Sequence, residues 1–161
     1  LLTLSALPGP AAFGGLGDPA LTRKMLQKLR EGGVPQRIEA VRALGVIGTG
    51  DAVEPLMLAL KDAHSRVREA AAASLGKLAD AAARAALTAA LQDESSRVRE
   101  QAAGGLGRLQ DTDAVAPLIE LLRREQGTRT VAAAMHSLRL LTGREFKDAA
   151  RWVQWHGEGM P

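Results

Sequence analysis

Apolar residues recur along most of the chain at the spacing of an α-helix. In the segment RIEAVRALGVIG, Ile38, Val41, Leu44 and Ile47 are three residues apart and would share one face of a helix. The same pattern predicts helices over residues 20–31, 35–47, 51–61, 65–78, 81–92, 95–109, 113–124 and 128–141. The short segments between them favour antiparallel packing within each consecutive pair.

The apolar stripes themselves repeat with a period of 31 residues. Leu44, Leu75 and Leu106 are one period apart, and a glycine follows each of them. The last unit is out of step by one residue, because Leu138 lies 32 residues after Leu106. A fixed period of this length is typical of stacked helical repeats. We therefore expect an all-α solenoid, or α-α superhelix, of about four antiparallel helix pairs.

The repeat divides the chain into three parts. Residues 1–19 are rich in proline and glycine, and we expect either an N-terminal arm or the remnant of a signal peptide in its uncharged residues 1–17. Residues 20–142 form the predicted solenoid, and residues 143–161 form a predicted C-terminal capping helix and tail. A signal remnant would place the protein in the periplasm or outside the inner membrane, and an arm leaves a cytoplasmic location open. No segment is apolar and long enough to span a membrane.

Composition supports close helix packing and limits the chemistry. Alanine and leucine dominate, tyrosine is absent, and only two Phe and two Trp are present, which favours helices over a β-sandwich. The 21 basic and 18 acidic residues give a mixed surface with a net charge of +3, a weak argument for nucleic-acid binding. The absence of cysteine excludes disulfides and thiolate metal sites.

The glycine-rich segment GVIGTGDAVEPL raises the question of a phosphate-binding loop, since such loops lead into helix N-termini. Gly45 recurs in every period, whereas Gly48 is replaced by Ala79 and then by Gln110. A helical stripe rather than a strand precedes the segment, and no Gly-Lys-Ser/Thr follows it. We therefore interpret it as a turn in which Gly48 ends one helix and Asp51 caps the next. A glycine recurring inside the second helices predicts close approach of a neighbouring helix.

The units resemble HEAT repeats, in particular the short bacterial HEAT-like repeats that also occur in phycobilisome bilin lyases. The shared features are a proline in the first helix (Pro55, Pro117), an aspartate after it (Asp62, Asp93) and a Val-Arg pair at the start of the second helix. The resemblance covers roughly residues 20–142. It implies the solenoid architecture and leaves the function open, because the family serves many roles.

The resemblance also implies a ladder of ion pairs between Asp and Arg residues of successive repeats. Asp62, Arg68, Asp93 and Arg99 match this pattern. The first unit keeps only Arg37, and the last unit keeps neither partner. We therefore expect a ladder that is limited to the middle of the chain.

The C-terminal segment LTGREFKDAARWVQWHGEGMP departs from the repeat and resembles the ending of many bacterial HEAT-like proteins. It contains Phe146, Trp152 and Trp155, three of the four aromatic residues of the chain. The end of a solenoid exposes an unpaired apolar face, so we expect these aromatic side chains to cap it. The alternative is an aromatic docking point for a partner.

No catalytic or metal-binding constellation is recognisable. His64, His136 and His156 have no second histidine or carboxylate at metal-ligand spacing. HEAT-repeat deoxyhypusine hydroxylases hold iron with repeated His-Glu pairs, and this sequence has no His-Glu dipeptide. A bilin-lyase activity would need a tetrapyrrole groove, for which no aromatic or Cys/His cluster is found. We therefore predict that the chain is not an enzyme and holds no cofactor or metal.

The predicted function is that of a scaffold or adaptor that binds a protein partner, alone or within a larger assembly. In HEAT stacks the second helices line the concave face, which makes their charged residues the predicted contact surface. These residues are Arg42, Arg66, Glu69, Lys77, Arg97, Glu100, Arg108, His136 and Arg139. The first alternative is nucleic-acid binding through the same basic residues, as in HEAT-like DNA glycosylases. The second alternative is a chromophore protein of the bilin-lyase type.

Overall fold

Helices occupy most of the chain that the computed structural model describes, residues 19–48 and 50–159. The predicted N-terminal arm or signal remnant lies outside the described residues, except for its last residue, Pro19. The described helices form four consecutive pairs and a final helix. They are α1 (Pro19–Glu31) with α2 (Val34–Ile47), α3 (Val53–Ala59) with α4 (Ser65–Leu78), α5 (Arg84–Ala90) with α6 (Ser96–Arg108), α7 (Val115–Arg124) with α8 (Thr128–Thr142), and α9 (Ala149–Gly157).

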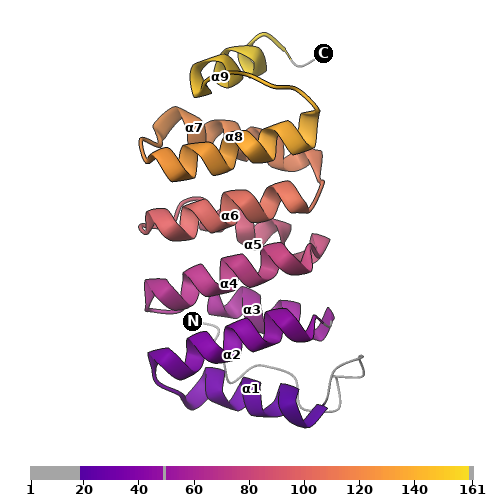
Figure 1. The fold of residues 1–161 in the computed structure, drawn as a ribbon, viewed down its shortest axis with the longest axis vertical. Coiled ribbons are helices and arrows are strands. Elements are labelled where there is room, and N and C mark those ends of the chain that lie inside the picture. The colour runs from indigo at the N-terminus through magenta and orange to yellow at the C-terminus, as the bar shows by residue number, and fades with distance from the viewer. Residues whose placement is uncertain (1–18, 49, 160–161) are drawn as a thin grey trace.

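The pairs are stacked along one axis, with α1 at one end and α9 at the other (Figure 1). The second helices, α2, α4, α6 and α8, lie above one another in one layer, and α3, α5 and α7 lie behind them. This arrangement is the predicted all-α solenoid. Successive second helices contact one another extensively, whereas successive first helices make few contacts.

Each helix pair contributes fully buried leucines at equivalent positions, which confirms the register of the repeat. These leucines are Leu44, Leu75, Leu106 and Leu138 on the second helices and Leu56, Leu87 and Leu118 on the first helices, all 0% exposed. They belong to one apolar cluster that runs from α1 to α9. The core is therefore continuous along the stack, and each pair buries its apolar face against its neighbours.

The recurring glycine of each second helix lies against a small residue of the next second helix. Gly45 faces Ser74, and a β-carbon at Gly45 would lie 2.6 Å from the Ser74 Cβ. Gly107 faces Ser137 at 2.6 Å in the same way, while Gly76 faces the backbone of Gly105 at 2.7 Å. We call this row of contacts the glycine seam. It confirms the predicted close approach and explains why the second helices pack so tightly.

The first helices begin differently from the prediction. Short 3-10 turns, Gly50–Ala52, Ala81–Ala83 and Thr112–Ala114, precede α3, α5 and α7. The N-cap of α3 is Ala52, so the prediction that Asp51 caps this helix is wrong. The capping carboxylates of the later units lie further upstream, where Asp80 accepts a hydrogen bond from the Ala82 N–H.

The second helices end in the same left-handed conformation whether or not glycine is present. Gly48 has a φ of 70°, as predicted for a glycine that ends a helix, and Ala79 and Gln110 have φ values of 50° and 54°. These are the positions at which the sequence repeat replaces glycine. The turn geometry is therefore set by the packing of the units, and the later units adopt it at a steric cost.

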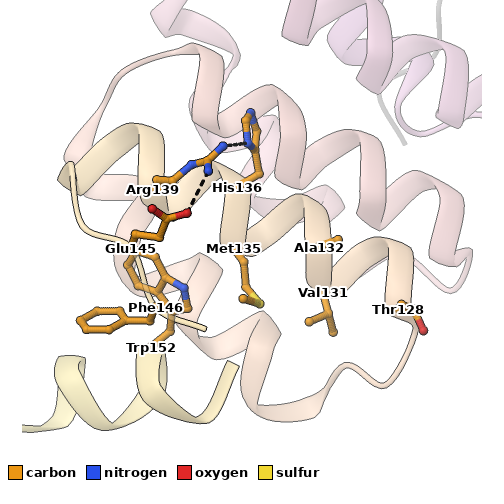
Figure 2. Close-up of a pocket in the computed structure, with 9 residues that line it drawn as sticks. All are labelled: Thr128, Val131, Ala132, Met135, His136, Arg139, Glu145, Phe146 and Trp152. Atoms are coloured by element: carbon orange, nitrogen blue, oxygen red, sulfur yellow. Dashed lines mark hydrogen bonds and ion pairs between the residues drawn. The ribbon is translucent and has the colours of Figure 1, made fainter. Parts of the chain in front are cut away.

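The aromatic side chains of the C-terminal segment contact one another, and Phe146 and Trp152 lie beside α8 (Figure 2). Trp152 is 1% exposed and belongs to the core, and α9 packs chiefly against α7. The rings of Phe146 and Trp152 meet edge to face with centroids 4.8 Å apart, and Trp155 lies 5.9 Å from both. The Arg144 guanidinium lies 5.2 Å from the centroid of the Trp155 ring, at cation–π distance.

Gly107→Ala is expected to destabilise the fold, because the new β-carbon would lie 2.4 Å from Ser137 Oγ and 2.8 Å from Ser137 Cα. Such overpacking costs about 1–3 kcal/mol or more, which outweighs the gain of about 1 kcal/mol in helix propensity. Gly104→Ala, in the same helix, is the control, because its nearest neighbour is the Arg108 guanidinium at 3.9 Å. Urea denaturation should show opposite signs for the two variants, and equal effects would contradict the glycine seam.

Ala79→Gly is expected to stabilise the protein, because Ala79 is exposed and has a φ of 50°. Removing a left-handed alanine relieves about 1–2 kcal/mol, against about 0.5–1 kcal/mol for the added backbone entropy of glycine. A rise in melting temperature should therefore be measurable by circular dichroism. The matched control is Ala85→Gly, at an exposed position inside α5, which should lower the melting temperature.

Candidate partner-binding surface

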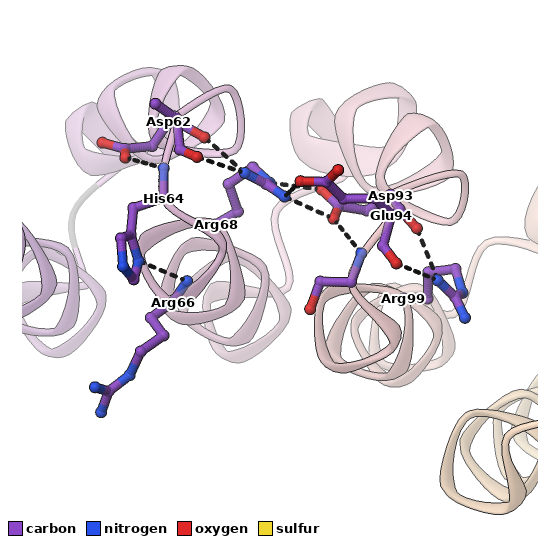
Figure 3. A network of polar contacts seen from close by, with 9 residues as sticks. Asp62, His64, Arg66, Arg68, Asp93, Glu94 and Arg99 are labelled. Carbon is purple, nitrogen blue, oxygen red and sulfur yellow. Dashed lines mark hydrogen bonds and ion pairs between the residues drawn. The ribbon is translucent and has the colours of Figure 1, made fainter.

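An arginine near the start of each of the first three second helices joins its unit to the following turn. In all three cases Nε donates to a carboxylate of the next unit (Figure 3 shows the central pair). The pairs are Arg37–Asp62 at 2.8 Å, Arg68–Asp93 at 2.7 Å and Arg99–Glu125 at 2.6 Å. The ladder therefore spans all four helix pairs, and the prediction that it is limited to the middle of the chain is wrong. Glu125 supplies the last carboxylate, because the inserted residue shifts the register there.

Each arginine also fastens the turn that precedes its own helix. Arg68 Nη1 donates to the backbone carbonyl of Asp62 at 2.9 Å and to that of Ala63 at 3.2 Å. The partner carboxylate stabilises the next turn, since Asp93 Oδ1 accepts the Ser95 N–H at 2.8 Å. Arg68 and Asp93 have side chains that are only 9% and 11% exposed, so solvent screens this pair weakly.

The pKa values of the ladder follow from these bonds. Burial alone would raise the pKa of Asp93, but the hydrogen bonds from Arg68 and the Ser95 N–H, with the charges of Arg68 and Arg99, lower it below the ordinary 3.8. The hydrogen bond from Arg99 lowers the pKa of Glu125 below the ordinary 4.5, against the effect of burial. The hydrogen bond to Asp93 raises the pKa of Arg68, although its burial opposes this.

Other cations of the second-helix layer remain outside the ladder. Five of the predicted surface residues line one hollow of about 610 Å³ between α2, α4 and α6. They are Arg42, Arg66, Glu69, Lys77 and Arg97. Among the described residues, none of these five belongs to an ion pair within 4.0 Å. The hollow thus collects four positive side chains and one carboxylate that are free to meet a ligand. Ile38, Val46, Ala70 and Ala73 add apolar surface to it.

Two further hollows continue this surface toward the C-terminus. The first has a volume of about 380 Å³, and Arg97, Glu100, Thr128 and Arg129 are among its lining residues. The second, of about 400 Å³, is lined by residues of α8 and by the segment that leads to α9 (Figure 2). We call the latter the α8 hollow. Its full lining is Thr128, Val131, Ala132, Met135, His136, Arg139, Glu145, Phe146 and Trp152.

The predicted residues are therefore distributed over three adjacent hollows that share Arg97 and Thr128. His136 and Arg139 lie together in the α8 hollow, with Arg139 Nη2 3.0 Å from His136 Nδ1. Arg108 lines none of the three and instead lies over Gly76 of α4. Phe146 and Trp152, predicted as a cap or docking point, also line the α8 hollow. Its other apolar residues, Val131, Ala132 and Met135, were not predicted, although they lie 32 residues after Arg99, Glu100 and Ala103 of α6.

Two of the three histidines, His64 and His136, make local side-chain contacts. His64 is the N-cap of α4, and its Nδ1 accepts the Arg66 N–H at 3.3 Å. Within residues 19–48 and 50–159 no three His, Asp or Glu side chains are grouped closely enough to bind a metal ion. Over the same residues no helix combines the length and apolar character that a membrane span needs.

Comparison with known proteins agrees with this architecture. The family model for HEAT repeats matches residues 22–94 and 74–139. Human deoxyhypusine hydroxylase, solved in complex with glycerol, is similar in fold at 22% identity with a TM-score of 0.63. That match covers 88% of this chain and 48% of the hydroxylase, so the chain spans about half of that neighbour. The complex of CpcE and CpcF of phycocyanin lyase from a Nostoc species is similar at 21% identity with a TM-score of 0.62. That match covers 81% of this chain and 68% of the phycocyanin lyase chain. No curated protein matches the sequence.

These neighbours correct one prediction. The sequence predicted that the chain is not an enzyme, but the similar structures are those of a hydroxylase and a lyase. The prediction is therefore wrong, because the same stack of helix pairs occurs in proteins whose names are those of enzymes. At these identities the similarity establishes the shared fold alone.

Asp93→Asn is expected to lower the free energy of unfolding at pH 7 by roughly 1–3 kcal/mol, since it leaves the buried Arg68 donors without their carboxylate. The folded pKa of Asp93 lies below the unfolded value, so its stabilisation is complete above about pH 4 and disappears as the pH falls through the folded pKa.

Denaturant titrations from pH 7 to pH 2 should therefore show wild type and Asp93→Asn converging in acid. Glu94→Gln is the control, because Glu94 also contacts Arg68 but its side chain is 84% exposed. A constant difference across this pH range, or an equal loss in the control, would refute the assigned role of Asp93.

Proposed function

The chain belongs to the HEAT-repeat family, and from this premise we propose that it binds a protein partner through the concave face of its second helices. The proposed contact residues are Arg42, Arg66, Glu69, Lys77, Arg97, Glu100, Arg108, His136 and Arg139. The observation that carries the proposal is the hollow between α2, α4 and α6, where four unpaired cations surround one carboxylate.

The charge of this hollow favours an acidic partner segment. Arg66 and Arg97 project from the first turns of α4 and α6, and Lys77 lies near the end of α4. These cations come from three helices that the glycine seam holds at fixed spacing. A carboxylate-bearing segment that crosses the helices would meet several of them at once, and the prior placement of the charges reduces the entropic cost of binding.

The surroundings of the cations favour protein over nucleic acid. Glu69 lies in the same hollow and Glu100 in the adjacent one, where each would repel a phosphate backbone. The hollow has no aromatic side chain on which a base could stack. Its apolar residues Ile38 and Val46 suit side chains of a protein instead, and Val46 is 82% exposed.

Nucleic-acid binding is the second candidate, because four clustered cations could also contact phosphates. The two candidates differ in their dependence on salt. Neutralising four phosphates of a duplex would give a slope of log K against log salt of about −3.6. Binding of a protein segment with apolar contacts would depend on salt more weakly.

The test is affinity capture from the native lysate, with and without nuclease, followed by mass spectrometry. We expect a protein that remains bound after nuclease treatment. In the double variant Arg66→Glu with Arg97→Glu, its recovery should fall at least tenfold, because two of the four positive charges of the hollow are reversed. Complete loss of all bound material on nuclease treatment would instead support nucleic-acid binding.

The control is Arg30→Glu, which changes an exposed charge on α1 away from the hollow and should leave capture unchanged. Thermal unfolding of each variant verifies that the fold is intact. Equal loss of capture in the control would show that net charge, rather than this surface, determines binding.

A further inference from the structure

Each second helix before α8 has one face that is covered by the second helix of the next unit. The same face of α8 is the last in the described stack. On α6 this face is covered by α8. Thr130 Oγ1 donates to the Ser96 carbonyl at 3.3 Å, and Ser137 Oγ donates to the Ala103 carbonyl at 2.8 Å. Gly107 completes the contact against Ser137. Ser96, Ala103 and Gly107 therefore form the ridge of α6 on which the next helix lies.

The equivalent ridge of α8 lies 32 residues further along the chain and consists of Thr128, Met135 and Arg139. All three line the α8 hollow. No further second helix follows α8 in the described chain, and α9 packs chiefly on α7. The α8 hollow therefore occupies the place where the stack would receive its next second helix, with Phe146 and Trp152 as one wall (Figure 2).

The residue types on this ridge are not those of a solvated end. Val131 stands at the position of the ladder arginine Arg99, and Ala132 at that of Glu100. Met135 replaces a small residue and is half-buried. A terminal repeat needs a polar outer face for solubility, whereas the α8 surface beside this ridge has lost two charges, at Val131 and Ala132, and the ridge has gained the apolar side chain of Met135. These changes fit a helix-binding groove.

Arg139 changes which helix the groove accepts. It stands where the other three units have the seam glycine, so another repeat cannot pack here at the same distance. Its guanidinium contacts His136 Nδ1 at 3.0 Å and Glu145 at 3.2 Å. Side-chain exposures of 48% for Arg139 and 78% for Glu145 make this an open ion pair of small net stability. A carboxylate brought by a ligand can therefore replace Glu145.

We propose that the α8 hollow binds an amphipathic helix of a partner protein. This helix places a large apolar side chain between Met135 and Phe146 and a carboxylate on Arg139. His136 and Arg139 also belong to the proposed contact surface, but the α8 hollow shares no lining residue with the cationic hollow between α2, α4 and α6, so the two hollows can be tested separately.

A second copy of this chain fits the groove poorly. Head-to-tail stacking would bring α1 of one molecule onto α8 of the next. The described residues of α1 include Arg23, Lys24, Lys28 and Arg30 but only one acidic residue, Glu31. This excess of positive charge would face Arg139, so like charges oppose self-association here.

The binding test uses tryptophan fluorescence, because Trp152 and Trp155 are the only tryptophans of the chain and Trp152 lines the groove. The probe is a synthetic amphipathic helix of roughly 18 residues, with leucines on one face and glutamates flanking them. Its twin carries lysines in place of the glutamates. We expect a saturable spectral change with the acidic peptide. Its dissociation constant should be at least tenfold lower than that of the lysine twin.

Two variants assign the site. Met135→Glu should abolish the response to the acidic peptide, and Arg139→Glu should reverse the preference between the two peptides. Arg30→Glu is the control, because it changes an exposed charge on α1, at the other end of the stack, and should leave the titration unchanged. Thermal unfolding shows whether each variant is folded, and Arg139 is exposed, so the charge reversal does not disturb the core.

Several results would overturn the proposal. They are the absence of a saturable change with the acidic peptide, an unaltered response in Met135→Glu, or an equal loss in Arg30→Glu. A concentration-dependent shift of the tryptophan spectrum without peptide, with dimers in sedimentation, would assign the groove to a second copy instead. None of these results concerns capture through the α2–α4–α6 hollow, so the two proposals fail separately.

Discussion

The close contact between second helices determines most of the structure. A glycine of each second helix lies against serine or glycine of the next, and no β-carbon fits between them at Gly45, Gly76 or Gly107. Successive first helices make few contacts with one another, so the second helices form the continuous layer of the stack. Their close packing brings charged side chains from three successive helices to one hollow.

The basic residues of the second helices fall into two groups with different roles. One group, which includes Arg68, is held in the ladder, bonded to a carboxylate of the next unit and to carbonyls of its own turn. The other group, which includes Arg66 and Lys77, is exposed and belongs to no ion pair among the described residues. Basic residues at neighbouring sequence positions thus have separate roles: some stabilise the fold and others charge the surface. Composition alone shows only that positive and negative residues are both abundant.

Periodicity predicted the helix pairs, their register and the purpose of Gly45, because apolar spacing and packing follow directly from helix geometry. It did not predict the 3-10 turns before α3, α5 and α7, whose residues extend the same helical pattern. Glu125 was missed because a one-residue insertion moves it away from the expected spacing. The α8 hollow joins α8 to Phe146 and Trp152, and such contacts between non-repeating segments leave no periodic signal. Catalysis could not be judged from missing motifs, since enzymes share this fold.

The central joint of the seam differs from the other two in a way that bears on how the stack can bend. Ser74 and Ser137 each donate a hydrogen bond to the preceding second helix, but Gly105 occupies the equivalent place between α4 and α6 and has no hydroxyl to donate. Arg68 and Asp93 fasten this joint at the turn end of the helices. The α4–α6 joint is therefore held by an ion pair at the turn end of the helices and lacks the serine hydrogen bond of the other two joints. The α2–α4–α6 hollow lies across this joint, so any change in the angle between α4 and α6 would change the width of the hollow.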